Sequence, residues 1–566
     1  MQAAEFINEC KSIVGGGFVI TSSKSMERFC RGFRSGKGKA LAVVRPGSLL
    51  EQWLILQLCH KQNKIIIMQA ANTGLTEGSS PSSGYDRDVV IVSTTRIKGL
   101  KVIKDGKQVI AFPGTSLDEL EKELKSFQRQ PHSVLGSSCM GASVIGGVCN
   151  NSGGALVQRG PAYTELSLFA KITNNDELVL INHLGIELGQ KPEEILTNLE
   201  NGNFNFSDIE SNNRLASDKD YEQRVRDVKS NTPARFNADP KRLYEASGCA
   251  GKLSVFAVRL DTFPIEKEKV VFYIGTNNPE KLTSLRRHML STFDNLPVSA
   301  EYMHRDCYDM SKKYGKDTIL TIKLLGTAKL SLLWNLKSWI DTRLNELFFI
   351  PKNLTDKFLL LLSTVWPNIL PKRMERFRNR FEHHLILTMA GDGIKEAGLY
   401  LSKNFNDEAG DHFVCEEKEA ELAAQHRFAA AGAAVKYMAI HHKEVADIIS
   451  LDIALRRNDT NWFETLPSDI DKSMIHKLYY GHFFCHVLHQ DYIIKKGHDS
   501  SLVKNKLLMF TAKRGAKYPA EHNVGHLYDA EKPLVDFYKN CDPTNSFNSG
   551  IGGTEKNKNY KDPACC

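Results

Sequence analysis

The sequence of 566 residues has no long apolar run and no paired-cysteine motif. No stretch reaches the roughly 18 apolar residues that a membrane-spanning helix needs. The opening residues, MQAAEFINECKSIVGGG, lack the basic and apolar regions of a secretory signal peptide. The 12 cysteines are scattered without CxxC spacing, which favours reduced thiols over a disulfide framework. These absences predict a chain that folds in a cytoplasm, with Cys565 and Cys566 in an ordinary frayed tail.

The two common phosphate-binding signatures are also missing, since neither GxxxxGK[ST] nor the G-x-G-x-x-G spacing occurs. Residues 65–79, IIIMQAANTGLTEGS, instead run from an apolar stretch into a loop of small residues. Such loops let backbone N–H groups approach phosphate oxygens closely. Residues 132–163 and 244–256 are similarly rich in small side chains. The three stretches predict a groove for an extended phosphate-bearing cofactor; the alternative is a set of tight turns and bulges.

Composition is that of a soluble globular protein, and the length predicts two to four domains. The net charge of +8 is modest, but residues 329–380 hold ten Lys and Arg against four Asp and Glu, among Trp334, Trp339 and Trp366. Basic residues interleaved with aromatic ones are typical of a segment in a membrane interface. A helical subdomain with ordinary core faces fits equally well. Nucleic-acid binding is not expected, because the charge is local and no recognition motif accompanies it.

Short β-branched runs and helical patterns alternate along the first 260 residues, which predicts a mixed α+β domain. Ser116 and Glu119 form a potential capping box at the start of a helix over 116–127. Residues 208–231 are polar and predict an exposed excursion or a solvated helix, and the alanine-rich residues 420–437 predict a helix. Strands are expected at 41–44, 64–69, 88–93 and 252–263, with an Asp-Gly hairpin over 102–112.

Histidine is concentrated near the C-terminal end, where residues 476–526 hold seven of the 18 in the chain. Histidines with a nearby glutamate can bind a divalent metal, and histidine can also abstract a proton at neutral pH. Arg456 and Arg457 could clamp a carboxylate with two parallel hydrogen bonds, or form a solvated basic surface. The candidate histidines and glutamate are His482, His486, His489, Glu521, His522 and His526.

Four stretches together resemble one known family. They are FRSGKGKALAVVRPGSLLEQW, IIIMQAANTGLTEGS, HSVLGSSCMGASVIGGVCNNSGGALVQRGPAYTELSLFA and YPAEHNVGHLY. They closely resemble the quinone-dependent D-lactate dehydrogenases of bacterial respiratory membranes, and the likeness runs nearly end to end. The resemblance implies an α+β protein with a vanillyl-alcohol-oxidase-type FAD-binding domain, a discontinuous α+β cap domain and a basic helical membrane-binding segment.

The resemblance also implies where FAD binds. In that fold a strand-to-loop turn of small residues holds the pyrophosphate, and no histidine occurs in this loop that could attach flavin covalently, so we expect non-covalent FAD. The residues that match the family's FAD contacts are Ala70, Ala71, Asn72, Thr73, Gly74, Gly78, Ser79, Gly136, Ser143, Gly153 and Val255.

For the substrate the match is looser. Wider relatives that oxidise D-2-hydroxy acids carry an Arg in an A-L-R-E stretch, two histidines seven apart and an E-H dipeptide. The corresponding residues here are Arg456, His482 with His489, and Glu521-His522. The Glu of A-L-R-E is Arg457 in this chain, and the G-D-G-N pattern between the histidines is replaced, so a divalent metal at His482, His489 and Glu521 is an open alternative.

The expected reaction is hydride transfer from C2 of D-lactate to FAD, with His522 as general base and Arg456 holding the carboxylate. Electrons would then pass to a membrane quinone. The alternatives are dehydrogenation of another D-2-hydroxy acid, glycolate or D-2-hydroxyglutarate, and a lipid-binding protein whose flavin site has decayed.

The resemblance further implies the domain order and the location. An FAD-binding domain is expected at 1–261 with a return at 515–566. A cap domain is expected in pieces at 262–303, 381–418 and 443–514. A membrane-binding domain is expected at 304–380 and 419–442. The expected location is peripheral, on the cytoplasmic face of the bacterial inner membrane, against an anionic lipid surface.

Overall fold

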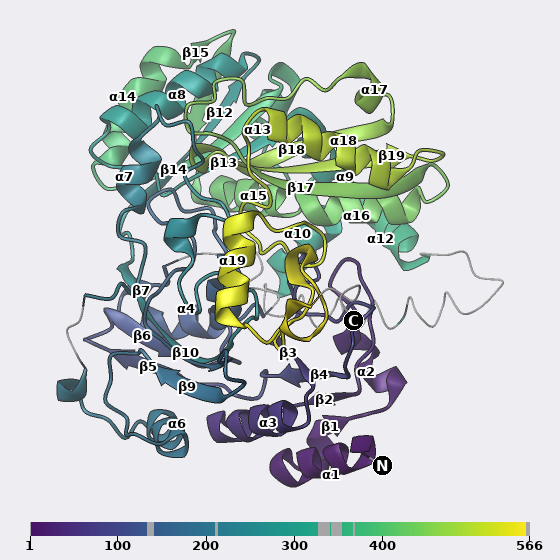
Figure 1. The fold of residues 1–566 in the computed structure, drawn as a ribbon. Helices are drawn as coiled ribbons and strands as arrows, with labels where there is room; N and C mark the ends of the chain where they lie inside the picture. Colours follow the sequence, from purple (N-terminus) through teal and green to yellow (C-terminus); the bar gives the residue numbers. More distant parts are fainter. Residues whose placement is uncertain are drawn as a thin grey trace.

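The computed structural model describes residues 2–132, 141–209, 213–325, 340, 354–365 and 368–561. Three of the expectations above fall outside these ranges. They are the FAD contact Gly136, the tryptophans Trp334, Trp339 and Trp366, and the tail residues Cys565 and Cys566. In Figure 1 the described chain forms a lower body, which contains the N-terminal end, and an upper body built on one large sheet.

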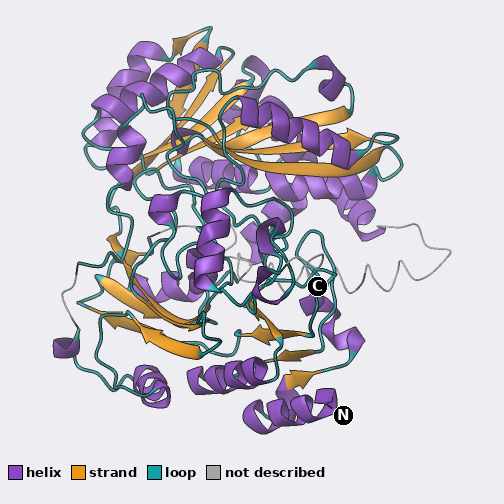
Figure 2. Cartoon of the chain, in the orientation of Figure 1, coloured by secondary structure: helices purple, strands orange, loops and turns teal. Residues whose placement is uncertain are grey.

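Two larger sheets form most of the lower body (Figures 1 and 2). In the first, three parallel strands pair with one short antiparallel strand, in the order β1 (Val19–Ile20), β2 (Ala42–Val44), β4 (Val89–Ser93), β3 (Ile65–Gln69). The second is antiparallel, in the order β5 (Leu100–Ile103), β6 (Gln108–Ala111), β10 (Ser254–Asp261), β8 (Ser167–Ile172), β9 (Leu178–Asn182). The strands predicted from β-branched runs are confirmed, as is the hairpin that joins β5 to β6.

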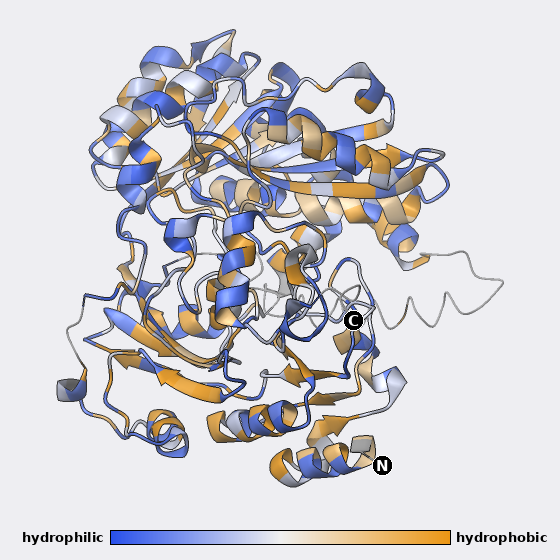
Figure 3. Cartoon of the chain, in the orientation of Figure 1, coloured by the Kyte–Doolittle hydropathy of each residue, from blue (hydrophilic) through white to orange (hydrophobic). Residues whose placement is uncertain are grey.

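The parallel strands are continuously hydrophobic because both of their faces are covered. Helices α1 (Gln2–Val14) and α3 (Leu49–Lys61) supply side chains to the core on one face. Helix α2 (Ser23–Cys30) packs with Val43, Ile65 and Ile67 on the other. Figure 3 shows these strands as largely hydrophobic. The chain therefore leaves β3 from within a fully packed layer, which fixes the start of the loop that follows.

Two local predictions in the lower body have different outcomes. The capping box of α4 (Leu117–Lys125) is confirmed, with Ser116 and Glu119 bonded reciprocally. The solvated helix expected within 208–231 is wrong in part. In α7 (Tyr221–Arg226) Tyr221 is fully buried and Val225 is buried with it, because two apolar residues four apart give this charged helix an inward face.

The C-terminal stretch returns to the lower body and lies beside β3. The N–H of Ile66 donates to the carbonyl of Ser546, and the N–H of Asn548 donates back to Ile66, over 2.8 and 2.9 Å. Just before this bridge, Asp542 lies fully buried 3.6 Å from the ammonium of Lys252. Burial lowers the pKa of Lys252 to about 8 even with that carboxylate beside it. The pair fixes the C-terminal stretch to the lower body.

The upper body is one antiparallel sheet of eight strands drawn from three separated parts of the chain. Their order is β15 (Asn406–Asp407), β16 (Gly410–Val414), β12 (Lys269–Thr276), β14 (His383–Ala390), β13 (Ser299–His304), β18 (Met474–His482), β19 (Val487–Lys495), β17 (Val445–Ala454). The register places Glu301 directly opposite His482 and Asp452 directly opposite His489.

The boundaries of the three domains expected from the resemblance stay a prediction.

Helices cover both faces of this sheet. Each face carries its own hydrophobic core, and alternate residues of β12 point into different cores. Phe272 and Ile274 pack in the first core, and Tyr273 packs in the second. The first core includes α8 (Pro279–Thr292), α14 (Gly393–Asn404) and α18 (Ser500–Lys513). The second includes α9 (Arg305–Tyr314), α13 (Lys372–Arg380), α15 (Glu417–Phe428) and α16 (Ala430–Ile440). The alanine-rich helix predicted over 420–437 is therefore two helices that meet at Ala429.

Helices α10 (Lys316–Leu325) and α12 (Leu354–Val365) extend the second layer, and both contact its other helices. Much of the positive charge on α13 is already neutralised within the protein. Arg373 pairs with Glu419, Arg378 with Asp309 and Arg380 with Asp411. In the described ranges, no helix combines the length and apolar character needed to cross a bilayer.

Candidate active site and cofactor cradle

The loop after β3 presents backbone donors that the protein does not use. In the described part of the chain, none of the N–H groups of Ala71, Asn72, Thr73 or Gly74 donates a hydrogen bond to a protein acceptor. A Cβ placed on Gly74 would meet no atom within 4 Å, so open space lies beside the loop. Free N–H groups facing open space fit the oxygens of a phosphate-bearing cofactor.

Side-chain bonds hold this loop in shape. Asn72 has a φ of +54°, donates from its amide to the carbonyl of Arg31 over 2.8 Å and accepts from the hydroxyl of Ser79 over 2.9 Å. Gln69, the last residue of β3, donates to the carbonyl of Ser79. Ala70 opens the loop directly after it. The loop is thus closed on itself between Asn72 and Ser79, which keeps its free N–H groups in place.

Residues 521–526, which we call the crossing segment, lie against this loop. The N–H of His526 donates to the carbonyl of Thr76, and a Cβ on Gly525 would lie only 1.7 Å from that oxygen. A Cβ on Gly78 would lie 2.6 Å from the amide of Asn523. These approaches require glycine, and they place Glu521 and His522 next to the candidate cofactor loop.

The crossing segment also touches the second glycine-rich stretch. A Cβ on Gly153 would lie 2.7 Å from Glu521 Oε1, so Gly153 is brought to the site as expected. Ser143 caps the short helix α5 (Val144–Cys149), and Asn150, directly after that helix, accepts a hydrogen bond from Asn523.

Val255 is the exception among the expected cofactor contacts. Its side chain lies in the core beneath α5, and its carbonyl accepts from Gln52 over 3.4 Å. The structure therefore does not bring the Val255 side chain to the loop residues, because inward-facing positions of β10 pack against α5.

Two imidazoles and a carboxylate converge beyond the crossing segment. The Nε2 atoms of His482 and His489 are 3.4 Å apart, and His482 Nε2 lies 3.5 Å from Glu521 Oε2. Their ligand atoms all lie within 4.8 Å of one another. Two imidazole nitrogens and a carboxylate oxygen form a donor set for a divalent cation.

A carboxylate on the neighbouring strand lies beside the outer nitrogen of each imidazole. Glu301 Oε1 lies 2.5 Å from His482 Nδ1, and Asp452 Oδ1 lies 3.3 Å from His489 Nδ1. Asp452 also accepts from the N–H of Glu521 over 2.8 Å. Carboxylates in this position orient imidazoles that bind metals, so the surroundings fit a cation as well as the donors do.

Two buried arginines complete a row of alternating charges. Arg235 pairs with Glu521 and donates to the carbonyl of Gly154 over 2.7 Å, and Arg427 lies 2.9 Å from Glu301 Oε2. Burial alone would lower the pKa of His482, but the two glutamates raise it to about 10. Without a cation His482 is therefore protonated, and a bound cation would have to displace that proton. We call Arg235, Glu521, His482, Glu301 and Arg427 the charge row.

The two adjacent arginines expected at the substrate differ sharply. Arg457 commits its guanidinium to the protein, donating to the Thr232 and Arg224 carbonyls and to two hydroxyls over 2.6–3.0 Å. Arg456 is half-buried, and in the described ranges none of its guanidinium N–H groups donates a hydrogen bond. Only Arg456 is free to bind a ligand.

His522 lies on the crossing segment with 32% of its side chain exposed and its Nε2 3.9 Å from Asp452 Oδ2. His486 and His526 do not join the cluster. His486 bonds the carbonyl of Arg456 through Nδ1, and His526 lies 3.3 Å from the carbonyl of Gly550. The site thus has one accessible imidazole, His522, beside two that the carboxylates fix.

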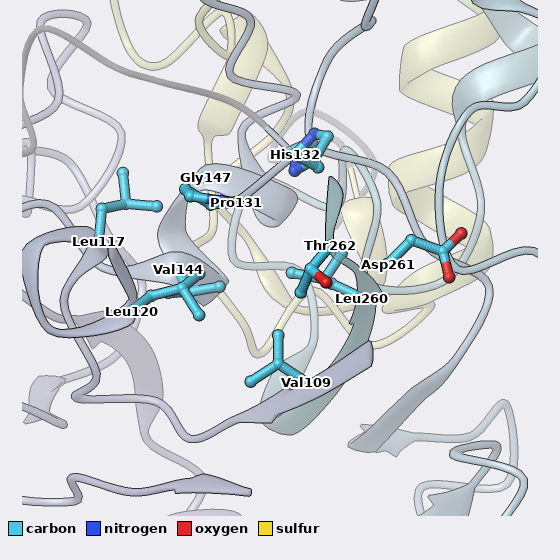
Figure 4. Close-up of a pocket in the computed structure, with 11 residues that line it drawn as sticks. Val109, Leu117, Leu120, Pro131, His132, Val144, Gly147, Leu260, Asp261 and Thr262 are labelled. Atoms are coloured by element: carbon cyan, nitrogen blue, oxygen red, sulfur yellow. The ribbon is translucent and has the colours of Figure 1, made fainter. Parts of the chain in front are cut away.

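A separate cavity lies between α4, α5 and the strands β6 and β10 (Figure 4). Apolar side chains line most of it, with His132 at its upper edge, and Asp261 points away from it. Burial lowers the pKa of His132 to about 4. The lining includes Val144 and Gly147 of α5 but no member of the imidazole cluster, so this cavity is distinct from the candidate site.

Sequence reasoning missed four charged residues of the site: Arg235, Glu301, Arg427 and Asp452. None lies in a motif. Glu301 and Asp452 reach the histidines only through the register of β13 with β18 and of β17 with β19. Asp452 carried one usable signal, its place four residues before Arg456.

Comparisons with known proteins show what the chain as a whole is similar to. Residues 40–172 match the family model "FAD binding domain", and residues 271–560 match "D-lactate dehydrogenase, membrane binding". The chain is 57% identical to the quinone-dependent D-lactate dehydrogenase of Escherichia coli K12, over 98% of each chain. It is 55% identical to that of Haemophilus influenzae, over 99% of each. The solved structure of p-cresol methylhydroxylase shares the fold, with a TM-score of 0.57 at 10% identity, over 98% of this chain and 97% of that one.

The contrast between the two arginines predicts that their substitution has effects of very different size on stability. Arg457→Gln should lower the free energy of unfolding by about 2–4 kcal/mol, because it removes the four hydrogen bonds of a buried guanidinium. Arg456→Gln should change it by less than about 0.5 kcal/mol. Urea denaturation of the two purified variants checks this, and equal losses would contradict the assignment.

Proposed function

The chain belongs to the family of quinone-dependent D-lactate dehydrogenases, FAD flavoproteins with a membrane-binding domain, and from this premise we propose how its own residues carry out the reaction. D-lactate is oxidised to pyruvate beside the crossing segment, and the electrons then pass to a membrane quinone. The observation that carries the proposal is the contact between the crossing segment, with Glu521 and His522, and the loop of unused N–H donors.

The loop from Ala70 to Gly74, with Gly78 and Ser79, holds the pyrophosphate of non-covalent FAD. Its free N–H groups replace the hydration of the phosphate oxygens without a lysine. Ser143 and Gly153 contact the cofactor nearby, and Gly136 and Val255 are assigned from the resemblance alone. Bound FAD would accept the hydride that leaves C2 of the substrate.

Arg456 binds the carboxylate of D-lactate, since its guanidinium has donors to spare and Arg457 has none. His522 accepts the proton of the substrate hydroxyl. It is the accessible imidazole at the site, and Asp452 beside it stabilises the imidazolium that forms. Together they fix which face of C2 meets the cofactor.

His482, His489 and Glu521 hold a divalent cation, whose chemistry would be to polarise the hydroxyl oxygen of the substrate. Support comes from the convergence of the three donors and from the carboxylates on both outer nitrogens.

The alternative substrates are glycolate and D-2-hydroxyglutarate. They would use the same residues, and other parts of the pocket would select the length of the acid.

Attachment to the membrane is peripheral, at the cytoplasmic face of the bacterial inner membrane, and uses residues 304–380 and 419–442. The FAD-binding domain is then 1–261 with 515–566, and the cap domain 262–303, 381–418 and 443–514. Support comes from α12, which exposes large apolar side chains four, seven and eight residues after Leu354. The exposed fractions are 39% for Leu354, 60% for Phe358, 65% for Leu361 and 40% for Leu362. Anionic lipid headgroups would attract the exposed Lys372 and Arg376.

His522→Gln should leave FAD bound but slow flavin reduction by D-lactate about 10²–10⁴-fold, because the base is lost. Anaerobic absorbance spectra before and after adding D-lactate measure this, with L-lactate as the control isomer. Reduction at the normal rate would remove His522 from the mechanism. A flavin in the unaltered protein that neither lactate isomer bleaches, but glycolate or D-2-hydroxyglutarate does, would select the alternative substrate.

The metal proposal predicts about one divalent cation per chain. His489→Ala should lose this cation. His498→Ala, the control, should keep it, because His498 is exposed and lies just after β19. Elemental analysis after dialysis against Mn²⁺ or Zn²⁺ and then buffer provides the count. Equal metal content in the two variants would show that the imidazole cluster does not hold the ion.

Phe358→Glu with Leu361→Glu should weaken binding to vesicles of phosphatidylethanolamine and phosphatidylglycerol, because two charges would enter the apolar face of α12. Leu399→Glu is the matched control, since Leu399 is 68% exposed on α14, on the opposite face of the large sheet. Co-sedimentation measures the bound fraction. Unchanged binding of the α12 variant would exclude α12 as the contact.

A further inference from the structure

We propose that Arg427 is a positioning residue for the reaction, acting through Glu301 on the imidazole of His482. The inference rests on the proposed role of the imidazole cluster. It assigns a function to a side chain of the helical layer that covers one face of the upper sheet. In the described contacts this side chain touches neither the crossing segment nor the cofactor loop.

The geometry is a two-step contact through one carboxylate. Glu301 Oε1 lies 2.5 Å from His482 Nδ1, and Glu301 Oε2 lies 2.9 Å from a guanidinium nitrogen of Arg427. Both oxygens of the carboxylate are thus held by different partners. Because each carboxylate oxygen has its own partner, the Glu301 carboxylate cannot rotate without breaking its contact to His482 or to Arg427. This fixed carboxylate in turn sets the orientation of the His482 ring.

Arg427 is itself fixed. Its side chain is 11% exposed, and its guanidinium lies 4.6 Å over the ring of Tyr480, whose hydroxyl donates to Asp491 over 2.7 Å. The planar cation can stack on the ring and pair with the carboxylate at the same time, which the ammonium of a lysine does less well.

The helix that carries Arg427 is anchored to the layer around it. The hydroxyl of Ser311 in α9 donates to the carbonyl of His426 over 2.8 Å, and the rings of His426 and Tyr308 lie 4.4 Å apart. Arg427 therefore ties the position of α15 to the position of an imidazole in the active site.

Removing Arg427 would leave one oxygen of the partly buried Glu301 carboxylate without its cation. Glu301 would then shift toward His482 or toward solvent, and the imidazole would tilt with it. Replacing a group that orients a site imidazole in this way typically costs 10–100-fold in activity or affinity. Loss of a comparable surface pair costs little.

The experiment compares Arg427→Gln with Arg373→Gln, in FAD-loaded full-length protein. Arg373 is the matched control because it also pairs with a glutamate of α15, Glu419, but far from the cluster along the helix. The readouts are the rate constant of flavin reduction by D-lactate in anaerobic stopped flow, and the dissociation constant of oxalate from its effect on the flavin spectrum. Thermal midpoints check that each variant is folded.

Arg427→Gln should slow flavin reduction and weaken oxalate binding, together by about 10–100-fold. Arg373→Gln should change neither, and Arg427→Lys should fall between. Because Arg427 acts through Glu301, the double variant with Glu301→Gln should be no worse than Glu301→Gln alone.

Three results would overturn the inference, and they can be told apart. Normal behaviour of Arg427→Gln alongside an impaired Glu301→Gln would remove Arg427 and keep the site. Multiplied effects in the double variant would show that Arg427 acts independently of Glu301. Normal behaviour of both single variants would instead contradict the proposed role of the imidazole cluster.

Discussion

Five charged side chains in one row, three buried and two partly buried, constrain much of this structure. A buried charge is tolerated only when it is paired, and removing one partner typically costs about 3–5 kcal/mol. The charge row alternates in sign, and each of its five members comes from a different part of the chain. The loop around Arg235, the crossing segment, β18, β13 and α15 must therefore all be in place before every charge of the row has its partner. The same requirement makes the site a junction of the lower body, the upper sheet and the helical layer.

Close backbone approach is the second constraint, and it acts at the cofactor loop. Gly78 and Gly525 allow the crossing segment to lie against that loop at distances that a Cβ would forbid. The consequence is chemical: the residue that we propose as the base follows Glu521 directly and lies beside the loop whose N–H groups are free. Bulkier side chains at these glycines would move the free N–H groups of the loop away from the proposed base, His522. The small residues noticed in the sequence therefore serve contact between two protein segments as much as contact with a cofactor.

The sequence predicted what depends on local pattern. The strand before the loop, the Asp-Gly hairpin and the capping box at Ser116 follow from residue types at short range, and the structure has all three. The spacing of His482 and His489 marked two imidazoles that do converge. What could not be read is register: Glu301 lies 181 residues from His482 in sequence and meets it only because β13 pairs with β18. Residue type could not distinguish Arg456 from Arg457 either. The two differ because only Arg457 donates hydrogen bonds to residues 224–232.

Charge balance in the cluster connects the cation to the substrate. Without a cation, Arg235, Arg427 and the protonated His482 face three carboxylates, so these six side chains are together neutral. The carboxylates are Glu301, Asp452 and Glu521. A divalent cation that displaces the proton of His482 would leave one excess positive charge. A substrate carboxylate supplies one negative charge, so an anionic 2-hydroxy acid restores neutrality where a neutral alcohol does not. Selection of a carboxylate substrate would then come from the whole cluster as well as from the free guanidinium of Arg456.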